Sequence, residues 1–252
     1  SFSELTAAVT KAEKAGGGIV YVKGSSISCT AQLALKASNA NVSIIGVKNS
    51  DGTYPVLDFS AFRSAYIGKA TTDSEVGIRI SGSNYTIKNL IIQKAPDNGI
   101  QIKGSSAGNN TIENCIVRYN NDAGVQITGG AYNNAVENIY SYRNCDVYTL
   151  GSNADGFAVK LSAGPEEVTS ASEFQNSKNT FVNCYSWENS DDGWDSFDKT
   201  TSGYTKDLSY EECACWNNGN PDIFTGKYDY ENGNALDTNL YLVELISNQD
   251  KN

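Results

Sequence analysis

The chain has 252 residues with 29 acidic and 19 basic side chains, a formal net charge of −10, and neither histidine nor methionine. Without histidine there is no Ser-His-Asp triad, no histidine metal site and no imidazole base, so acid–base chemistry falls to carboxylates, lysine, arginine, tyrosine or cysteine. The acidic balance argues against nucleic acid as a partner, and it means that a polyanionic partner needs a bridging cation.

The same composition indicates a cellular setting. No apolar run approaches the roughly 18 residues of a membrane-spanning helix, so we expect no membrane partner. Low charge, abundant Asn, Ser, Thr and Gly, and only 4 Pro are typical of a secreted, extracellular β-rich protein, which we expect to be monomeric. The chain starts without Met and without a signal peptide, which indicates processing or a longer precursor. The length suits one all-β domain, or at most two domains.

Residues 1–18 predict a short capping helix. Ser1 and Glu4 have the spacing of a capping box, and the glycines at 16–18 end the segment. Apolar side chains recur between these two signals with helical spacing, at Leu5, Ala8, Val9 and Ala12. Residues 19–22 then alternate as a first strand. Such a helix is the expected cover for the open end of a stack of strands.

A short motif built around glycine recurs from about residue 75 onward. Its glycines are Gly77, Gly99, Gly124, Gly156 and Gly193. Two alternating strand patterns accompany each repeat, and no helical period lies between them, which predicts a parallel β-helix over residues 19–218. The spacing of the glycines widens along the chain, which places insertions in the turns of the later coils. Insertions in such repeats collect on one face, often the binding face.

A second series within the repeat consists of asparagines, which are Asn89, Asn114, Asn138 and Asn183. We expect an internal ladder of side-chain amides that bond to one another and to turn backbone. Cys115 and Cys184 follow two of them and are expected as small buried hydrophobes. Cys213 is expected to stack over Cys184, with a disulfide as an open alternative. The six cysteines contain no CxxC pair, so we expect no zinc site.

Four carboxylates fall together in two consecutive repeats. Asp191, Asp192 and Asp195 crowd one turn and the strand after it, and Asp192 aligns with Asp155 of the preceding repeat. Neighbouring coils lie about 4.8 Å apart, so the aligned carboxylates would nearly touch, which is unfavourable without a cation. Oxygen ligands and high charge favour Ca²⁺ over Mg²⁺. The alternative is a solvated acidic turn. Asp97 and Asp122 occupy the same columns and are interpreted as turn formers.

Residues 154–160 (ADGFAVK) and 189–195 (NSDDGWD) resemble the paired motifs of family 9 polysaccharide lyases. These are pectate lyases with a right-handed parallel β-helix, and the resemblance covers roughly residues 75–218. It implies that Asp155, Asp191, Asp192 and Asp195 bind a catalytic Ca²⁺. It also implies cleavage of polygalacturonate by β-elimination, in which a base removes the C5 proton next to a carboxylate that the cation neutralises.

The sequence differs from the family at the lysine that acts as the base. The family carries this lysine in a string such as NGFK, whereas the nearest match here, residues 232–237 (NGNALD), has Asp237 in its place. Either the base lies elsewhere, or the chain ends inside an inserted segment, 219–252, before the lysine. Lys227 is the nearest lysine and our candidate base, with a surface lysine as the alternative. Lys160 is a candidate contact for a substrate carboxylate or a second candidate base.

Aromatic residues follow the acidic motif, and Trp216 and Tyr228 are our candidates for stacking on sugar rings, with exposed loop aromatics as the alternative. The sequence therefore predicts a secreted, Ca²⁺-dependent pectate lyase that acts on an acidic polysaccharide. The alternatives are a lyase for another uronan such as alginate, a β-helix that binds calcium and carbohydrate without catalysis, and a structural or adhesive β-helix.

Overall fold

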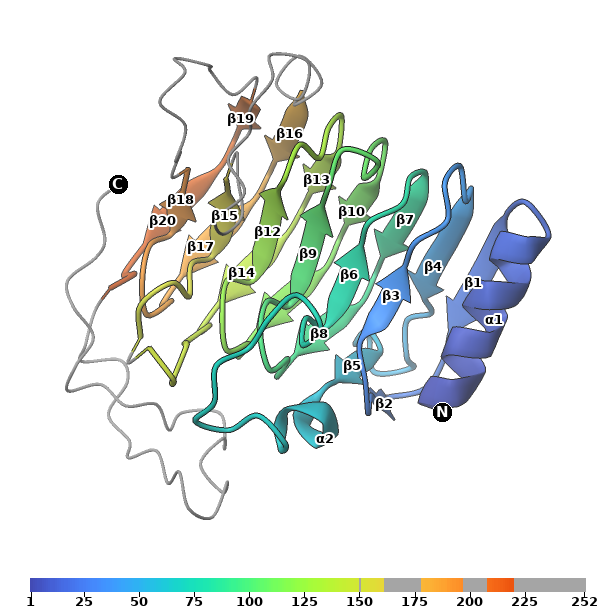
Figure 1. The fold of residues 1–252 in the computed structure, drawn as a ribbon, viewed down its shortest axis with the longest axis horizontal. Coiled ribbons are helices and arrows are strands. Elements are labelled where there is room, and N and C mark those ends of the chain that lie inside the picture. Colours follow the sequence, from blue (N-terminus) through green and yellow to red (C-terminus); the bar gives the residue numbers. More distant parts are fainter. Residues whose placement is uncertain (150, 161–177, 197–207, 220–252) are drawn as a thin grey trace.

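The computed structural model describes residues 1–149, 151–160, 178–196 and 208–219. Three parallel sheets wind around one core, and each complete coil of the chain contributes one strand to each sheet (Figure 1). The predicted parallel β-helix is confirmed. The sequence pattern showed only two strands per repeat, and the strands that it missed, such as Ile91–Gln93 and Ile116–Arg118, have three residues each.

Sheet A receives the first strand of each coil. Its members are β1 (Gly18–Val22), β4 (Val42–Gly46), β7 (Tyr85–Lys88), β10 (Thr111–Glu113), β13 (Ala135–Glu137), β16 (Asn179–Val182) and β19 (Leu208–Glu211). Sheet B receives the second. Its members are β2 (Ser26–Ser28), β5 (Val56–Asp58), β8 (Ile91–Gln93), β11 (Ile116–Arg118), β14 (Tyr140–Tyr142), β17 (Tyr185–Trp187) and β20 (Ala214–Trp216).

Sheet C receives the third strand of each coil. Its members are β3 (Leu33–Leu35), β6 (Ile78–Ile80), β9 (Ile100–Lys103), β12 (Val125–Thr128), β15 (Phe157–Val159) and β18 (Trp194–Asp195). Isoleucine, valine and leucine fill the interior between the three sheets in the early coils. In the later coils aromatic rings also pack in the interior, where Phe157 stacks on Trp194 with ring centroids 4.2 Å apart.

The N-terminal cap is the helix α1 (Phe2–Lys14), which lies against β1 and β4 at one end of the stack (Figure 1). Ser1 and Glu4 form the expected capping box, and Leu5 and Val9 are buried. The first strand begins at Gly18, inside the segment expected to be helical. A four-residue helix, α2 (Ser60–Arg63), was not predicted.

The predicted asparagine series is not internal, although one of its expected bonds is present, because the Asn114 amide donates to Asn89 Oδ1 over 3.4 Å. The four predicted asparagines lie at the turn between sheets A and B, partly exposed, with left-handed φ values between 51° and 59°. A one-residue turn needs this conformation, which asparagine tolerates better than most residues. The buried ladders are two other series, Asn110, Asn134 and Asn179 before sheet A, and Asn120, Asn144, Asn189 and Asn218 after sheet B.

The cysteines behave largely as expected. Cys115 and Cys184 are buried in the core, which confirms their role as small hydrophobes. Cys213 occupies the next coil after Cys184, in the register set by the pairing of Val182 with Glu211 and of Tyr185 with Ala214. All six cysteines are free thiols.

Candidate metal and substrate site

The acidic residues lie in the turns that lead from sheet B into sheet C. Asp155 precedes β15, and Asp191 and Asp192 precede β18 in the next coil. Backbone hydrogen bonds hold the two turns in register, because the Gly156 N–H donates to Asp192 O over 2.9 Å and the Phe157 N–H donates to Gly193 O over 3.1 Å. The alignment read from the glycine motif is therefore the spatial one.

Glycine is needed at position 156 because the coils approach closely. An added Cβ there would overlap the Ser186 hydroxyl and would lie 2.8 Å from Gly193 O. The motif glycines thus let the acidic turns stack directly on one another, which brings side chains of successive coils together.

Three carboxylates converge at this point. Oxygens of Asp155, Asp191 and Asp192 all lie within 4.8 Å of one another. Asp155 is 1% exposed; its Oδ1 accepts the Asp192 N–H over 3.1 Å, while its Oδ2 has no hydrogen-bond partner in the described part of the chain. Asp191 Oδ2 accepts the Asn153 N–H over 2.7 Å. A buried carboxyl group with one oxygen free of hydrogen bonds, next to two further carboxylates, suits a cation ligand.

The electrostatics of Asp155 agree with that fit. Burial raises the pKa of Asp155 well above its usual value; Lys160 opposes the rise, and the negative charges of Asp195, Asp191 and Asp192 add to it. A hard divalent cation removes this conflict, and carboxylate oxygens are the ligands that Ca²⁺ prefers. The residues present therefore fit calcium.

The fourth predicted ligand, Asp195, lies outside this group of three. Its Oδ2 is 2.9 Å from the ammonium nitrogen of Lys160, which is also 3.7 Å from Asp155 Oδ2. Burial disfavours the charged form of Lys160, but Asp155 and Asp195 outweigh that effect and raise its pKa. Lys160 is thus a protonated cation inside the cluster, at a position that the sequence marked only as a candidate substrate contact or base.

A polar row extends from this cluster along the outer face of sheet C. Asp195, Ala158, Gln126, Gln101 and Arg79 occupy one register column in five successive coils. The Gln101 amide donates to Gln126 Oε1 over 2.6 Å, and Arg79 donates to Gln101. Arg79 and Gln126 therefore offer hydrogen-bonding groups on this face, whereas Gln101 is buried and Ala158 has no polar side chain.

Lys103 adds a further cation to this face, and Asp73 pairs with both Lys103 and Arg79, at 2.7 and 3.1 Å. Sequence reasoning missed Arg79, Gln101 and Lys103. They occupy the second or fourth position of the strand that follows each motif glycine. Side chains at these positions face outward when those at the first and third positions face the core, so strand alternation could have identified them.

Trp216 lies on a different face. It is 48% exposed on the outside of sheet B and stacks on Trp187 with ring centroids 5.1 Å apart and planes 3° apart. Trp187 in turn stacks on Tyr142 at 4.5 Å. The structure thus separates Trp216 from the sheet C face that carries Lys160. Lys227 and Tyr228 lie outside the described residues.

Asp97 and Asp122 bond to their own turns, as expected for turn formers. Asp97 Oδ1 accepts the Asn98 N–H over 2.6 Å, and Asp122 Oδ1 accepts the Ala123 N–H over 2.7 Å. Burial raises the pKa of both carboxyls. Neither belongs to the group of three converging carboxylates.

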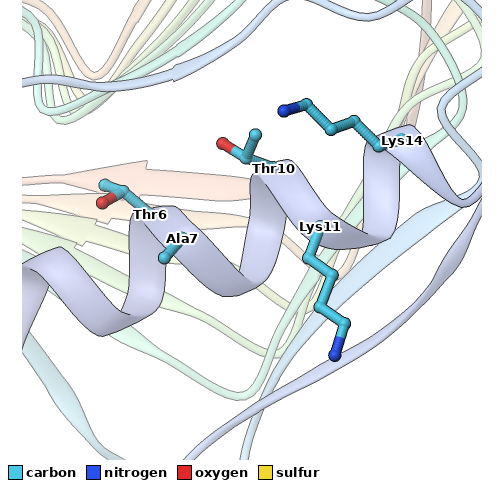
Figure 2. A pocket seen from close by; sticks show the side chains of 5 residues that line it. All are labelled: Thr6, Ala7, Thr10, Lys11 and Lys14. Carbon is cyan, nitrogen blue, oxygen red and sulfur yellow. The ribbon is translucent and has the colours of Figure 1, made fainter.

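A hollow of about 510 Å³ is present at the other end of the molecule, on α1. Thr6, Ala7, Thr10, Lys11 and Lys14 line it, and the two lysine side chains extend in different directions (Figure 2). The lining residues do not converge on a common point, so we assign no site there.

The fold and the acidic turns define a parallel β-helix with a carboxylate site between sheets B and C. Residues 1–236 match the family described as "Pel9A-like, right handed beta helix region", and the chain belongs to that family. This confirms the resemblance to family 9 polysaccharide lyases and the right-handed fold.

Several characterised proteins are similar to the chain. Pectate lyase L of Paenibacillus polymyxa (strain SC2) is 34% identical over 207 residues, which cover 79% of this chain and 41% of that protein. Pectate lyase L of Dickeya dadantii (strain 3937) is 32% identical over 152 residues, covering 60% of this chain and 26% of the relative. The crystal structure of pectate lyase Pel9A superposes with a TM-score of 0.56 at 26% identity, covering 81% of this chain and 44% of that one.

The chain therefore spans less than half the length of each of these relatives. Among the residues that the structure describes, no helix has the length and apolar character needed to cross a membrane.

Proposed function

We propose that the chain is the β-helix of a secreted, Ca²⁺-dependent pectate lyase that cleaves polygalacturonate by β-elimination. The observation that carries this proposal is the convergence of Asp155, Asp191 and Asp192, with a buried Asp155 oxygen that has no hydrogen-bond donor. Family membership and the names of the similar lyases support the reaction and the substrate class.

The carboxylates give the site its affinity for a cation. Asp155, Asp191 and Asp192 would hold Ca²⁺, with Asp195 as a fourth ligand. Bound calcium supplies positive charge that neutralises a uronate carboxylate and thereby makes the neighbouring C5 proton easier to remove. The same charge explains how a protein of net charge −10 binds a polyanion.

The outer face of sheet C would carry the sugar chain. Lys160 stands beside the acidic cluster, and Lys103 and Arg79 continue along the same face in earlier coils. The coils repeat at about 4.8 Å, and the three cations belong to the coils of β6, β9 and β15, where they would meet carboxylates along the sugar chain. Gln126, whose Oε1 accepts the buried Gln101 amide, supplies a half-buried amide between them for hydroxyl and carboxylate oxygens.

The proton at C5 requires a base. Lysine serves when its pKa is lowered toward the working pH. In the metal-free protein Asp155 and Asp195 raise the pKa of Lys160, and this positive charge supports a contact with a substrate carboxylate. Lys227 therefore stays our candidate base, and its role is a prediction that rests on sequence position.

The direct test is absorbance of the unsaturated product on polygalacturonate at alkaline pH. We expect the absorbance to rise with Ca²⁺ and to stop rising when EGTA is added. A rise on alginate but not on polygalacturonate would reassign the substrate. Calcium-dependent binding without any rise would show a non-catalytic β-helix and contradict the enzymatic part of the proposal.

Lys227→Met separates the base from the rest of the site. If Lys227 removes the proton, this variant loses the absorbance rise while its calcium affinity stays unchanged. Full activity in Lys227→Met would exclude that assignment.

A further inference from the structure

The acidic cluster contains its own cation. Lys160 follows the last residue of β15, and its ammonium nitrogen lies 2.9 Å from Asp195 Oδ2 and 3.7 Å from Asp155 Oδ2. The lysine side chain is 18% exposed, whereas Asp155 is 1% exposed. The positive charge is therefore held against two of the four carboxylates expected to bind calcium.

The carboxylate that contacts Lys160 most closely, Asp195, is also the one that lies apart from the other three. Asp155, Asp191 and Asp192 have oxygens within 4.8 Å of one another, and Asp195, which contacts Lys160, is not one of the group. An ammonium group and a divalent cation at neighbouring positions repel each other strongly in a buried site. Asp195 therefore has two competing partners.

We propose that Lys160 is the internal counter-ion of the acidic cluster and competes with the divalent cation for Asp155 and Asp195. The inference rests on the proposed calcium site and describes its regulation. Cation binding displaces the ammonium group, and Asp195 then joins the other carboxylates as a ligand. The displaced ammonium group remains on the outer face of sheet C, where it meets a substrate carboxylate.

A lysine suits this role. Its charge is compact and its four-carbon stem is flexible, so the group can move a few ångströms without disturbing β15. Before the cation binds, the ammonium offsets the repulsion among carboxylates that the coil stacking forces together. The residue thus stabilises the metal-free fold and lowers the affinity for the cation.

A purely structural role would have the opposite consequence. If Lys160 only held Asp195 in a geometry ready for calcium, removal of the lysine would weaken calcium binding. If Lys160 competes with the cation, removal of the lysine strengthens calcium binding. The direction of the change in calcium affinity therefore decides between the two roles, without any measurement of activity.

Lys103 provides a matched control. Lys103 pairs with Thr128 in the next coil, and Lys160 directly follows Val159, the partner of Ile127, so both lysines occupy one column of sheet C. Lys103 also contacts a carboxylate, Asp73, at 2.7 Å. It differs from Lys160 in lying two coils earlier, about 10 Å along the axis.

The experiment is calorimetric titration of the EGTA-stripped full chain with CaCl₂, together with thermal unfolding in EGTA. Lys160→Met should bind Ca²⁺ about tenfold or more tightly than the wild type, and its metal-free form should unfold at a lower temperature. Lys160→Arg keeps the charge and should bind no more tightly than the wild type. The calcium affinity of Lys103→Met should stay within about twofold of the wild type, because the charge that this variant removes is distant and screened.

Equal or weaker calcium affinity in Lys160→Met would overturn the inference, as would equal affinities of Lys160→Met and Lys160→Arg. Lys160→Gln serves as the neutral variant if Lys160→Met does not fold. Absence of calcium binding to the wild type would remove the proposed metal site itself. If the wild type binds calcium and the neutral variants bind it no more tightly, only the counter-ion role of Lys160 is contradicted.

Discussion

The backbone N–H of Asp192 donates to Oδ1 of Asp155 over 3.1 Å, from one coil of the β-helix to the next. This bond fixes the Asp155 carboxyl group beside Asp191 and Asp192, while its second oxygen, Oδ2, has no hydrogen bond in the described part of the chain and lies 3.7 Å from the Lys160 ammonium nitrogen. One oxygen of Asp155 thus serves the fold, while the other is available to a cation.

That division predicts opposite effects for Asp155→Asn. The amide oxygen keeps the bond from the Asp192 N–H, and the amide nitrogen donates toward the neighbouring carboxylates. The metal-free protein should therefore be more stable than the wild type, because a buried charge has been removed. Calcium affinity should fall by roughly a hundredfold, because a charged ligand is lost. Thermal unfolding in EGTA and calorimetric titration measure the two effects.

Asp97→Asn is the matched control for calcium affinity. Asp97 is also a buried turn aspartate with a raised pKa, but it lies outside the converging group. Its calcium affinity should stay within about threefold of the wild type. Equal losses of affinity in the two variants would indicate that net charge, and not the three converging carboxylates, governs binding.

Gly156→Ala tests the close stacking of the acidic turns. The added methyl group overlaps the Ser186 hydroxyl and approaches Gly193 O, so the coil must shift. We expect a loss of about 3 kcal/mol in the free energy of unfolding, together with a loss of calcium affinity. Urea denaturation and calcium titration measure both.

The control for that variant is Gly52→Ala. Gly52 has a φ of 87°, and a Cβ there would meet nothing within 4 Å. The backbone strain should lower stability by about 1–2 kcal/mol and leave calcium affinity unchanged. If Gly156→Ala retained full calcium affinity, the dependence of the site on close coil stacking would be refuted.

The glycine register was predictable from sequence because it depends on a local steric requirement repeated in every coil. The same register predicts that Asp155 lies beside Asp192, and the bond from the Gly156 N–H to Asp192 O confirms that the two residues are neighbours. The capping helix was equally accessible, since Ser1 and Glu4 act through local backbone bonds.

Orientation was harder to predict than register. The asparagines at 89 and 114 repeat as regularly as those at 120 and 144, yet only the second pair is buried. Spacing does not reveal whether a residue is repeated for its left-handed φ or for its side-chain bonds. The contact of Lys160 with Asp195 was also inaccessible, because it depends on which of several carboxylates a flexible side chain reaches.

The buried asparagine ladder after sheet B predicts a large effect of a substitution at Asn189. Its Oδ1 accepts the backbone N–H and the side-chain amide of Asn144 at 3.1 and 2.8 Å, and its own amide donates to Asn218 at 2.9 Å. Asn189→Ala leaves these buried groups without partners, and we expect a loss of about 3 kcal/mol in the free energy of unfolding.

Asn138→Ala is the comparison for the ladder. Asn138 is exposed and serves a turn with a φ of 55°, so its replacement should cost only about 1 kcal/mol. Urea denaturation of both variants measures the difference. Equal losses would mean that the buried amide ladder contributes nothing beyond turn conformation.

Asp146 predicts a pH dependence of stability in the metal-free protein. Burial raises its pKa to about 6, with a smaller contribution from Asp97, although Thr149 and Tyr148 donate to its carboxyl group. The folded state therefore binds this proton more tightly than the unfolded state. The resulting stabilisation is fully present below the unfolded pKa of about 4 and is lost as the pH rises through about 6, with an upper bound of about 3 kcal/mol.

Asp146→Asn should remove that component, because the amide oxygen still accepts the Tyr148 N–H but does not ionise. Urea denaturation in EGTA between pH 4 and pH 8 should show a smaller decline in stability for this variant than for the wild type. Asp51→Asn is the control, since Asp51 accepts a comparable bond from Thr53 in an exposed turn that lowers its pKa. Parallel pH profiles for the wild type and Asp146→Asn would show that Asp146 keeps an ordinary pKa, and would remove burial of this carboxyl as a source of the pH dependence.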